Sequence, residues 1–282
     1  RTQCANSVKQ VALSVHGYHS ANEQVPSATR GLVDLSWHVF VLPYIEMVNL
    51  FDSIDTTTPG SMTRPNRGSP HGLTRVGHYI CPSSPVDRML LAPSPPHVVN
   101  DPDRVPADTG EAPYTTHYYG ISGPRGTNPV TGTAYPQSPC NHDGIGTGMA
   151  TSGMFVPDEY LGGSGLVVRF AHVTDGLSST LMLGEMSWYS AEFGTRYRSW
   201  LRGGSRVNCY TVGARNAMNA INAGLRARML HRFSDIPMGS MHPGGATFGL
   251  GDGSVRYVSE DIDLTTYRAL ASRNGAELLG EY

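Results

Sequence analysis

Residues 242–258 read HPGGATFGLGDGSVRYV. Within this stretch, two runs of alternating apolar residues, Ala246–Leu250 and Val255–Val258, are separated by the turn-forming segment Gly251–Ser254. An Asp-Gly pair between such runs is the strongest short-range signal for a β-hairpin, because glycine tolerates the positive φ that the turn requires. The stretch therefore predicts a β-hairpin near the end of the sequence.

Helices are predicted on both sides of this hairpin. Residues Leu264–Ser272 form a short helical segment, which Asn274 and Gly275 would end. A longer amphipathic helix is predicted over residues 2–21, ending before Pro26. Its apolar residues recur at the i, i+3, i+4, i+7 spacing of one helical face: Val8, Val11, Ala12 and Val15.

The middle of the chain predicts a broken helix and several short strands. Ser36–Asp52 is rich in large apolar residues and is interpreted as a helical segment kinked at Pro43. The strand candidates are Gly77–Cys81, Thr115–Tyr119, Leu166–His172 and Thr180–Glu185. Together with the hairpin they predict an α+β fold, in which a leading helix precedes a mostly antiparallel sheet.

Three stretches rich in Pro, Gly, Ser, Thr and Asn are predicted to be loop insertions, near residues 54–70, 92–113 and 121–139. The sequence contains no internal repeat. We therefore expect two parts, a helix over residues 1–24 and a β-rich globular head with these insertions over residues 25–282.

The composition excludes several classes of protein. The formal net charge of the 282 residues is −2, which argues against nucleic-acid binding, since phosphate contacts need an excess of basic residues. The longest apolar runs are short, such as Val39–Leu42, so no segment of this sequence predicts a membrane span. Only 16% of the residues are charged, which also argues against a disordered chain.

The cysteines predict an oxidising compartment, although free thiols remain an alternative. The four are Cys4, Cys81, Cys140 and Cys209, with no C-x-x-C pair that would indicate a structural zinc site. Three disulfide connectivities are possible. Of these pairings we favour Cys140 with Cys209, because both lie in irregular segments.

No catalytic residue is predicted. His16 and His19 share a helical face but lack the His-Glu-x-x-His pattern of a zinc site, and packing is their more common role. The sequence contains neither a G-x-S-x-G nucleophile elbow nor a P-loop. The loop acids Asp101, Asp103, Asp108 and Glu111 would tolerate calcium, but their spacing is not that of an EF-hand.

A more specific pattern is His242, nine intervening residues, and then Asp252-Gly253. His242 could bind a ligand, or it could satisfy a backbone group where Gly244 and Gly245 allow close approach. With this spacing, the chain resembles the prepilin-type H-x(9)-DG domain proteins, a bacterial group catalogued as a domain of unknown function.

Further matches to this group are distributed along the chain. They are Arg1-Thr2-Gln3-Cys4-Ala5-Asn6, His16 with Tyr18 and His19, Ser36-Trp37, Leu42-Pro43-Tyr44, Cys81-Pro82-Ser83, Thr174-Asp175-Gly176 and Gly184-Glu185. Ser7, Gly17, Ser84, Leu177 and Ser179 depart from the family pattern. The family-motif residues to which we assign structural roles are Cys4, His16, His19, Trp37, Pro43, Cys81, Asp175, Gly176, Glu185, His242, Gly244, Gly245, Asp252 and Gly253.

The resemblance implies a pilin-like fold. Family members begin with a prepilin signal and a hydrophobic helix, as type IV pilins and type II secretion pseudopilins do. The sequence from Arg1 would follow directly, so that residues 2–21 form the soluble half of a pilin-like stalk and the hydrophobic half is absent. Either cleavage in nature or trimming would explain that absence.

These expectations lead to one function and its rivals. We expect a non-enzymatic, pilin-like structural protein, extracellular or on the cell surface, that self-assembles into or decorates a filament or tube. Its partner is then another copy of itself. The alternative is a calcium- or carbohydrate-binding module of a secretion or cell-surface apparatus, with an ion at Asp175, Glu185, His242 or Asp252. A hydrolase is a third possibility, which no nucleophile–base spacing supports.

Overall fold

The computed structural model describes residues 1–30, 35–58, 70–88, 111–138, 148–157, 166–190, 197–205, 210–226 and 233–277. Its helices are α1 (Thr2–Asn22), α2 (Trp37–Phe40), α3 (Val48–Ser53), α4 (Ala223–Arg226) and α5 (Leu264–Leu270). Its strands are β1 (Thr29–Arg30), β2 (Leu35–Ser36), β3 (Tyr118–Pro124), β4 (Leu181–Glu185), β5 (Gly204–Ser205), β6 (Tyr210–Thr211), β7 (Ala214–Ala217), β8 (Gly245–Leu250) and β9 (Val255–Ser259).

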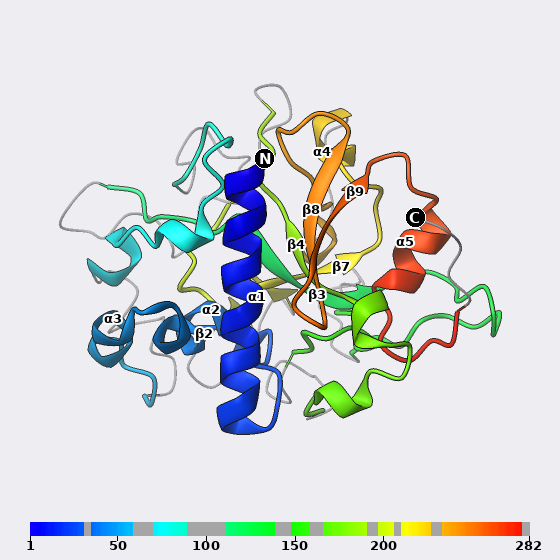
Figure 1. The fold of residues 1–282 in the computed structure, drawn as a ribbon, viewed down its shortest axis with the longest axis horizontal. Helices are drawn as coiled ribbons and strands as arrows, with labels where there is room; N and C mark the ends of the chain where they lie inside the picture. The colour runs from blue at the N-terminus through cyan, green and yellow to red at the C-terminus, as the bar shows by residue number, and fades with distance from the viewer. Residues whose placement is uncertain are drawn as a thin grey trace.

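Helix α1 confirms the predicted first helix and lies across one face of the main sheet (Figure 1). Its buried residues are Cys4, Val8, Val11, Ala12, Ser14 and Val15. The helix approaches strand β8 closely at Gly249, where an added Cβ would lie 3.2 Å from Val8 Cγ1. Each buried valine contributes roughly 1.5–3 kcal/mol, so this face holds the helix on the sheet.

The opposite face of α1 is exposed and mainly polar. We call Gln3, Asn6, Gln10 and Leu13 the exposed stripe of α1, because they follow one another along the outer side of the helix. Leu13 is its apolar member and is 46% exposed. Within the described residues, we find no helix that combines the length and the apolar character needed to cross a membrane.

The main sheet has the strand order β7-β3-β4-β8-β9. Only the outer pair β3–β7 is parallel, and the other neighbouring strands run antiparallel. Strands β3, β4 and β8 are buried throughout. One apolar cluster, with Val11 and Trp37, includes the α1 face, and a second, with Phe248 and Tyr267, includes α5. The fold is the expected α+β arrangement, a long first helix on a mostly antiparallel sheet.

The predicted hairpin is confirmed as β8 and β9, joined through an Asp-Gly turn. Leu250 N donates to Ser254 O at 2.9 Å, and Gly253 N donates back to Leu250 O at 2.9 Å. Gly253 has φ 79°, in the left-handed region that a side chain disfavours. Glycine at this position therefore allows the tight connection. The last predicted helix is also present, as α5.

The second helical segment is broken more often than expected. Ser36–Asp52 was predicted to be one kinked helix, but it contains α2, a 3-10 helix over Leu42–Ile45 and the beginning of α3. Pro43 lies in the first turn of the 3-10 helix, where its missing N–H costs least. Glu46 then takes a left-handed φ of 63° and separates the 3-10 helix from α3.

Two predicted strands are wrong. Gly77–Cys81 begins with a 3-10 helix, Gly77–Tyr79, in which Tyr79 N donates to Val76 O at 3.0 Å. Leu166–His172 also ends in a 3-10 helix, because Phe170 packs on α1 and stacks on the His19 ring at 3.9 Å. Tertiary packing has overridden the short apolar runs in both segments.

The strand predicted at Thr180–Glu185 is confirmed as β4, whereas the strand predicted at Thr115–Tyr119 is displaced. Strand β3 begins at Tyr118 and continues to Pro124, into a stretch that was predicted to be a loop. Gly120 makes this possible, since its lack of a side chain leaves room for the Phe155 ring.

The rest of the 121–139 insertion, as far as residue 138, packs on its own chain. Asn128 Oδ1 accepts hydrogen bonds from the backbone of Val130 and Thr131, and the Tyr135 hydroxyl donates to Glu277 at 2.7 Å. Residues 59–69 and 89–110, which hold most of the other two insertions together with Asp101, Asp103 and Asp108, lie outside the described residues. Glu111 is described and pairs with Arg88 at 3.2 Å.

Candidate functional site

Four family-motif side chains that are distant in sequence meet beneath the start of α1. They are Cys4, Cys81, Glu185 and His242, which we call the four-residue cluster. One potential ligand atom from each lies within 4.8 Å of the others, and all four residues are buried. Among the described residues, these four form the one group of three or more His, Cys, Asp or Glu side chains whose ligand atoms lie close enough together to hold a metal ion.

Cys4 and Cys81 form a disulfide that links the first turn of α1 to the segment after the 3-10 helix Gly77–Tyr79. The bond joins residues 77 apart in sequence. It leaves Cys140 with Cys209 as the pairing for a second intramolecular bond. Both of these cysteines lie outside the described residues, so that pairing stays a prediction.

Glu185, the last residue of β4, is fully buried and held through both carboxylate oxygens. Its Oε1 accepts a hydrogen bond from Ser187 Oγ at 2.7 Å, and its Oε2 accepts one from Thr247 N of β8 at 3.0 Å. These contacts fix the orientation of the carboxylate. They also compensate part of the cost of burying it, which would be high for an unpaired charge.

His242 precedes β8 and directs its ring toward both the disulfide and the carboxylate. Its Nε2 lies 3.7 Å from Cys81 Sγ and 3.7 Å from Glu185 Oε1. The loop is aligned with β4 because Gly239 N donates to Glu185 O at 2.8 Å. Burial lowers the pKa of His242, against the opposing effect of Glu185.

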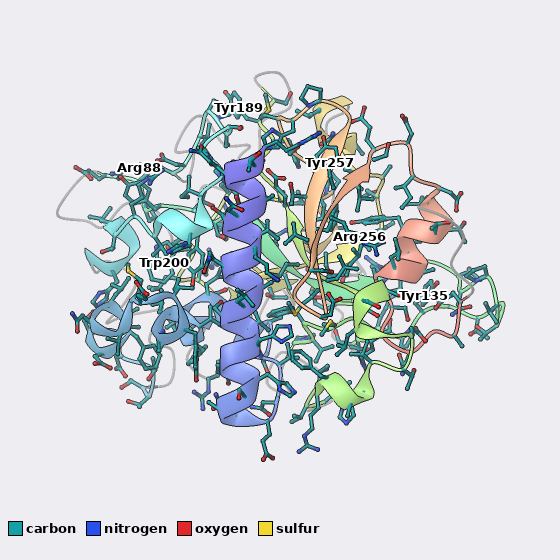
Figure 2. All side chains as sticks on the ribbon, viewed as in Figure 1. Arg88, Tyr135, Tyr189, Trp200, Arg256 and Tyr257 are labelled. Carbon is teal, nitrogen blue, oxygen red and sulfur yellow. A yellow bond between two sulfur atoms is a disulfide. The ribbon has the colours of Figure 1, made fainter. Side chains whose placement is uncertain are left out.

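Tyr257 of β9 lies close to the N-terminal end of α1 (Figure 2) and contacts the loop that carries His242. Its hydroxyl donates to Pro243 O at 2.7 Å. The Arg1 guanidinium lies 4.7 Å from the centre of the Tyr257 ring, a cation–π contact. His242 itself is only 8% exposed.

His117 lies behind the cluster and supports Cys81. Cys81 N donates to His117 Nδ1 at 2.9 Å, so the proton of this imidazole is assigned to Nε2, which donates to Val86 O at 2.8 Å. Met186 N also donates to His117 O at 2.7 Å, beside Glu185. Burial lowers the pKa of His117 to about 4, which keeps the ring neutral near pH 7.

The Asp-Gly turn lies at the other end of β8 and is bound to α1. Lys9 Nζ donates to Gly253 O at 2.6 Å, and His16 Nε2 donates to Gly251 O at 3.0 Å. Asp252 Oδ1 accepts hydrogen bonds from the backbone N–H and hydroxyl of Ser254. The two halves of the H-x(9)-DG pattern therefore contact α1 at separate places, one at its start and one at His16.

Asp175 stabilises the end of the described chain. Its carboxylate accepts hydrogen bonds from Gly275 N at 2.7 Å and Ala276 N at 3.2 Å. Of the four residues proposed from the sequence as ion ligands, the structure brings Glu185 and His242 together. It places Asp175 and Asp252 in backbone-holding roles elsewhere.

The other family-motif residues have packing or backbone roles. His19 stacks on Phe170 and accepts a hydrogen bond from its N–H at 3.2 Å. Trp37 Nε1 donates to Gly213 O at 2.7 Å, and Pro43 lies in the 3-10 helix. Gly176 and Gly244 have φ values of 95° and 85°, and Gly245 lies against the Val258 carbonyl, where a side chain would clash.

The donor set limits which ions this site could hold. Calcium prefers six to eight oxygen ligands, but the four-residue cluster contains one carboxylate, one imidazole and two sulfurs. Sulfur and imidazole are instead typical ligands of zinc and neighbouring transition metals. In the disulfide form the two sulfurs are bonded to each other, and the cluster then covalently links α1 to the head.

Sequence reasoning identified the members of the cluster but not the cluster itself. Each belongs to a different family motif, and Cys4 and Cys81 were not paired because their separation of 77 residues carries no geometric information. The available signal was that both cysteines, unlike Cys140 and Cys209, belong to motifs of the resembled family. That signal supports a shared role but not a position in space.

Comparison with known proteins shows that most of the chain matches one protein family. A family model described as "Protein of unknown function (DUF1559)" matches residues 1–265, and this family is commonly associated with prepilin-type N-terminal cleavage proteins. Neither the comparison with curated proteins nor the comparison with solved structures gave a match. The match extends from Arg1, the N-cap residue of α1, through the hairpin and into α5. With its pilin-like helix-plus-sheet architecture, the chain belongs to the DUF1559 family of proteins of unknown function.

Proposed function

We propose that this chain is a non-enzymatic, pilin-like structural protein that self-assembles into, or decorates, an extracellular filament or tube. The observation that carries the proposal is the placement of α1. One face of this long helix is buried on the sheet, and the exposed stripe along its other face is open to a neighbour. A helix that lies on the outside of its own head is suited to packing beside the helices of other copies.

The Cys4–Cys81 disulfide supports a location outside the cytoplasm, on the cell surface or beyond it. Disulfides persist in oxidising compartments and are rare in the reducing cytosol. The bond also attaches the first turn of α1 to the head covalently. A subunit that transmits tension through its first helix would benefit from such an attachment.

A non-enzymatic role agrees with how the candidate chemical groups are used. Asp175, Asp252 and His16 all hold backbone groups, and His19 packs on Phe170. Glu185 is held from both oxygens beside a disulfide. Each of these five side chains therefore serves to hold the fold together.

The exposed stripe of α1 is the contact surface that we propose. Leu13 places an apolar side chain, 46% exposed, among the polar residues Gln3, Asn6 and Gln10. If this surface binds a different patch on the next copy, the contact is head-to-tail, and repetition gives a filament or a closed ring.

Negative-stain electron microscopy of the purified chain over a concentration series tests the proposal. We expect regular filaments or tubes from the wild-type chain and a loss of at least about tenfold in assembled mass for Leu13→Asp, since a buried charge without a partner is unfavourable. The matched control is Val48→Asp on α3, where the wild-type side chain is 48% exposed, and it should assemble like the wild type.

The possible results separate the two parts of the proposal. Dispersed monomers of the wild type at every concentration would overturn assembly by this chain. Normal filaments from Leu13→Asp would exclude the exposed stripe as the contact while leaving self-assembly established. Sedimentation velocity measures the distribution of monomers and assemblies in solution and provides the assembled fraction.

A further inference from the structure

We propose that reduction of the Cys4–Cys81 disulfide converts the four-residue cluster into a tetrahedral site for a divalent transition-metal cation of the zinc class. The ligands are Cys4 Sγ, Cys81 Sγ, His242 Nε2 and Glu185 Oε1. This site goes beyond the structural function proposed above and does not depend on it. A chain that never forms filaments would still contain the four ligands.

The distances between ligand atoms fit such a site. Zinc bonds to sulfur, nitrogen and oxygen of about 2.0–2.3 Å in a tetrahedron place the ligand atoms roughly 3.3–3.8 Å apart. His242 Nε2 already lies 3.7 Å from Cys81 Sγ and 3.7 Å from Glu185 Oε1. The four ligand atoms lie within 4.8 Å of one another. The bonded sulfurs therefore have to separate and any wider pair has to close by up to roughly 1 Å, movements that side-chain rotations allow.

The surroundings of the cluster support the ligands. Ser187 Oγ donates to Glu185 Oε1, and His117 Nδ1 accepts from the backbone N–H of Cys81. Partners of this kind orient metal ligands, and their removal usually weakens metal binding by about 10–100-fold. Glu185 and Cys81 are therefore already held in place before any metal binds.

Burial and charge also favour a divalent cation. Cys4, Cys81 and Glu185 are fully buried and His242 nearly so. Two thiolates and one carboxylate would bring three negative charges into this space, and a divalent cation would compensate two of them. Thiolate and imidazole ligands select zinc and similar metals over calcium or magnesium.

The redox step balances with a dithiol reductant, and it balances with a phosphine when water supplies the oxygen of the phosphine oxide and the two thiol protons. The disulfide accepts two electrons and two protons and becomes two thiols, while a dithiol reductant is oxidised to its own disulfide. The cation then displaces the two thiol protons and binds the two thiolates. In the reverse direction, oxidised glutathione accepts two electrons from the two thiolates and two protons from solvent, so that the Cys4–Cys81 bond forms again, two glutathione thiols result and the cation is released.

Cobalt(II) binding to the full chain tests the proposal. The chain is reduced with a phosphine under anaerobic conditions, freed of reductant and titrated with Co²⁺. We expect one Co²⁺ per chain, with a thiolate-to-cobalt charge-transfer band and the intense visible bands of a tetrahedral site. The same chain in its disulfide form is the matched control and should give neither signal. Oxidised glutathione should then release the bound cobalt.

Variants identify the ligands. His242→Gln and Cys4→Ser should each weaken cobalt binding by at least about tenfold and change the spectrum, since each removes a direct ligand. His16→Gln, which alters a histidine at the far end of β8, should leave binding unchanged. The double variant Cys140→Ser/Cys209→Ser should also bind normally, which excludes those two cysteines as the source of the signal. Circular dichroism checks that each variant is folded.

Three experimental results would each contradict the proposal. If the reduced wild-type chain binds no cobalt, the site does not exist. If the disulfide form binds cobalt as well as the reduced form, or if His242→Gln and Cys4→Ser leave the spectrum unchanged, the metal lies elsewhere. None of these results bears on filament formation, which is measured separately by electron microscopy.

Discussion

His38 is a fully buried titratable group whose contacts define its protonation. Its Nε2 donates to Tyr118 O at 2.8 Å, and its Nδ1 accepts from Ser36 Oγ at 2.7 Å. Burial lowers the pKa of His38 from 6.5 to about 3, assisted by Arg215 and opposed by the Tyr118 carbonyl. The neutral ring therefore connects β2 to β3, and protonating it would place a charge in the core.

This geometry predicts a loss of stability in mild acid. Between the folded pKa of about 3 and the unfolded value of 6.5, the unfolded chain binds a proton that the folded chain does not. The contribution of His38 to the free energy of unfolding therefore falls as the pH decreases below 6.5, by about 1.4 kcal/mol per pH unit, or roughly 2 kcal/mol near pH 5. Urea unfolding near pH 7 and near pH 5 measures this loss.

His38→Gln is the comparison for that measurement. Glutamine retains a donor for Tyr118 O but does not titrate, so the variant should lose about 2 kcal/mol less than the wild type between those two conditions. Equal losses in the two proteins would show that His38 does not contribute to the acid sensitivity.

At the scale of elements, the disulfide determines how α1 is held. The helix packs on the sheet through its buried side chains, while Cys4 fixes its first turn to Cys81. At its other end, Glu23 N donates to His19 O at 2.8 Å and ends the helix in a left-handed residue. The two ends are therefore secured by different means, the first covalent and the second by hydrogen bonding and packing.

Replacing both cysteines, Cys4→Ala with Cys81→Ala, should lower the free energy of unfolding by about 4 kcal/mol, because the bond closes a loop of 77 residues in the unfolded chain. For a domain of this size the loss corresponds to a decrease in Tm of roughly 7 °C. Differential scanning calorimetry without reductant measures it. Asn6→Ala, on the exposed stripe, is the control and should stay within about 0.5 kcal/mol of the wild type. An unchanged Tm in the double variant would mean that the bond adds no stability.

The elements also differ in how well the sequence predicted them. The hairpin, α1 and α5 depend on signals carried by adjacent residues, and all three were predicted. Gly77–Cys81 and Leu166–His172 contain short apolar runs that favour strands and helices about equally. Neither run found a partner strand, so the packing of Tyr79 and Phe170 decided their conformation.

At the scale of the whole molecule, the sheet separates two apolar cores. Val11 and Trp37 belong to the core that contains the α1 face, and Phe248 and Tyr267 belong to the one that contains α5. Strands β3, β4 and β8 are buried throughout, whereas in β9, at the sheet edge, only Val258 is buried. The centre of the sheet therefore has the greatest protection from solvent.

This arrangement predicts the pattern of amide hydrogen exchange. The amides of β4, which has strands paired on both sides, should exchange more slowly than those of β9, because an edge strand opens without disrupting both cores. Exchange measured by mass spectrometry on peptides from Leu181–Glu185 and Val255–Ser259 tests the order. Slower exchange in the β9 peptide would place the stable centre of the molecule elsewhere.

Part of the candidate site could be predicted from the sequence. Glu185 and His242 were proposed as ligands, and Cys4 and Cys81 were recognised as motif residues. Asp175 and Asp252 were proposed as ligands on the same grounds as Glu185 and His242. A motif match shows that a residue is part of the family pattern, but it does not show what its side chain contacts. Their hydrogen bonds to Gly275 and Ser254 became evident only from the fold.

The sequence by itself determined the local elements of this protein: the first helix from its apolar spacing, the hairpin from its Asp-Gly turn and the family from its distributed motifs. Tertiary structure alone decided the strand order, the Cys4–Cys81 pairing and the meeting of both cysteines with Glu185 and His242. The physical reason is the range of the interactions. Turn and helix preferences act between adjacent residues, whereas contacts between distant segments depend on which strands pair and in which register.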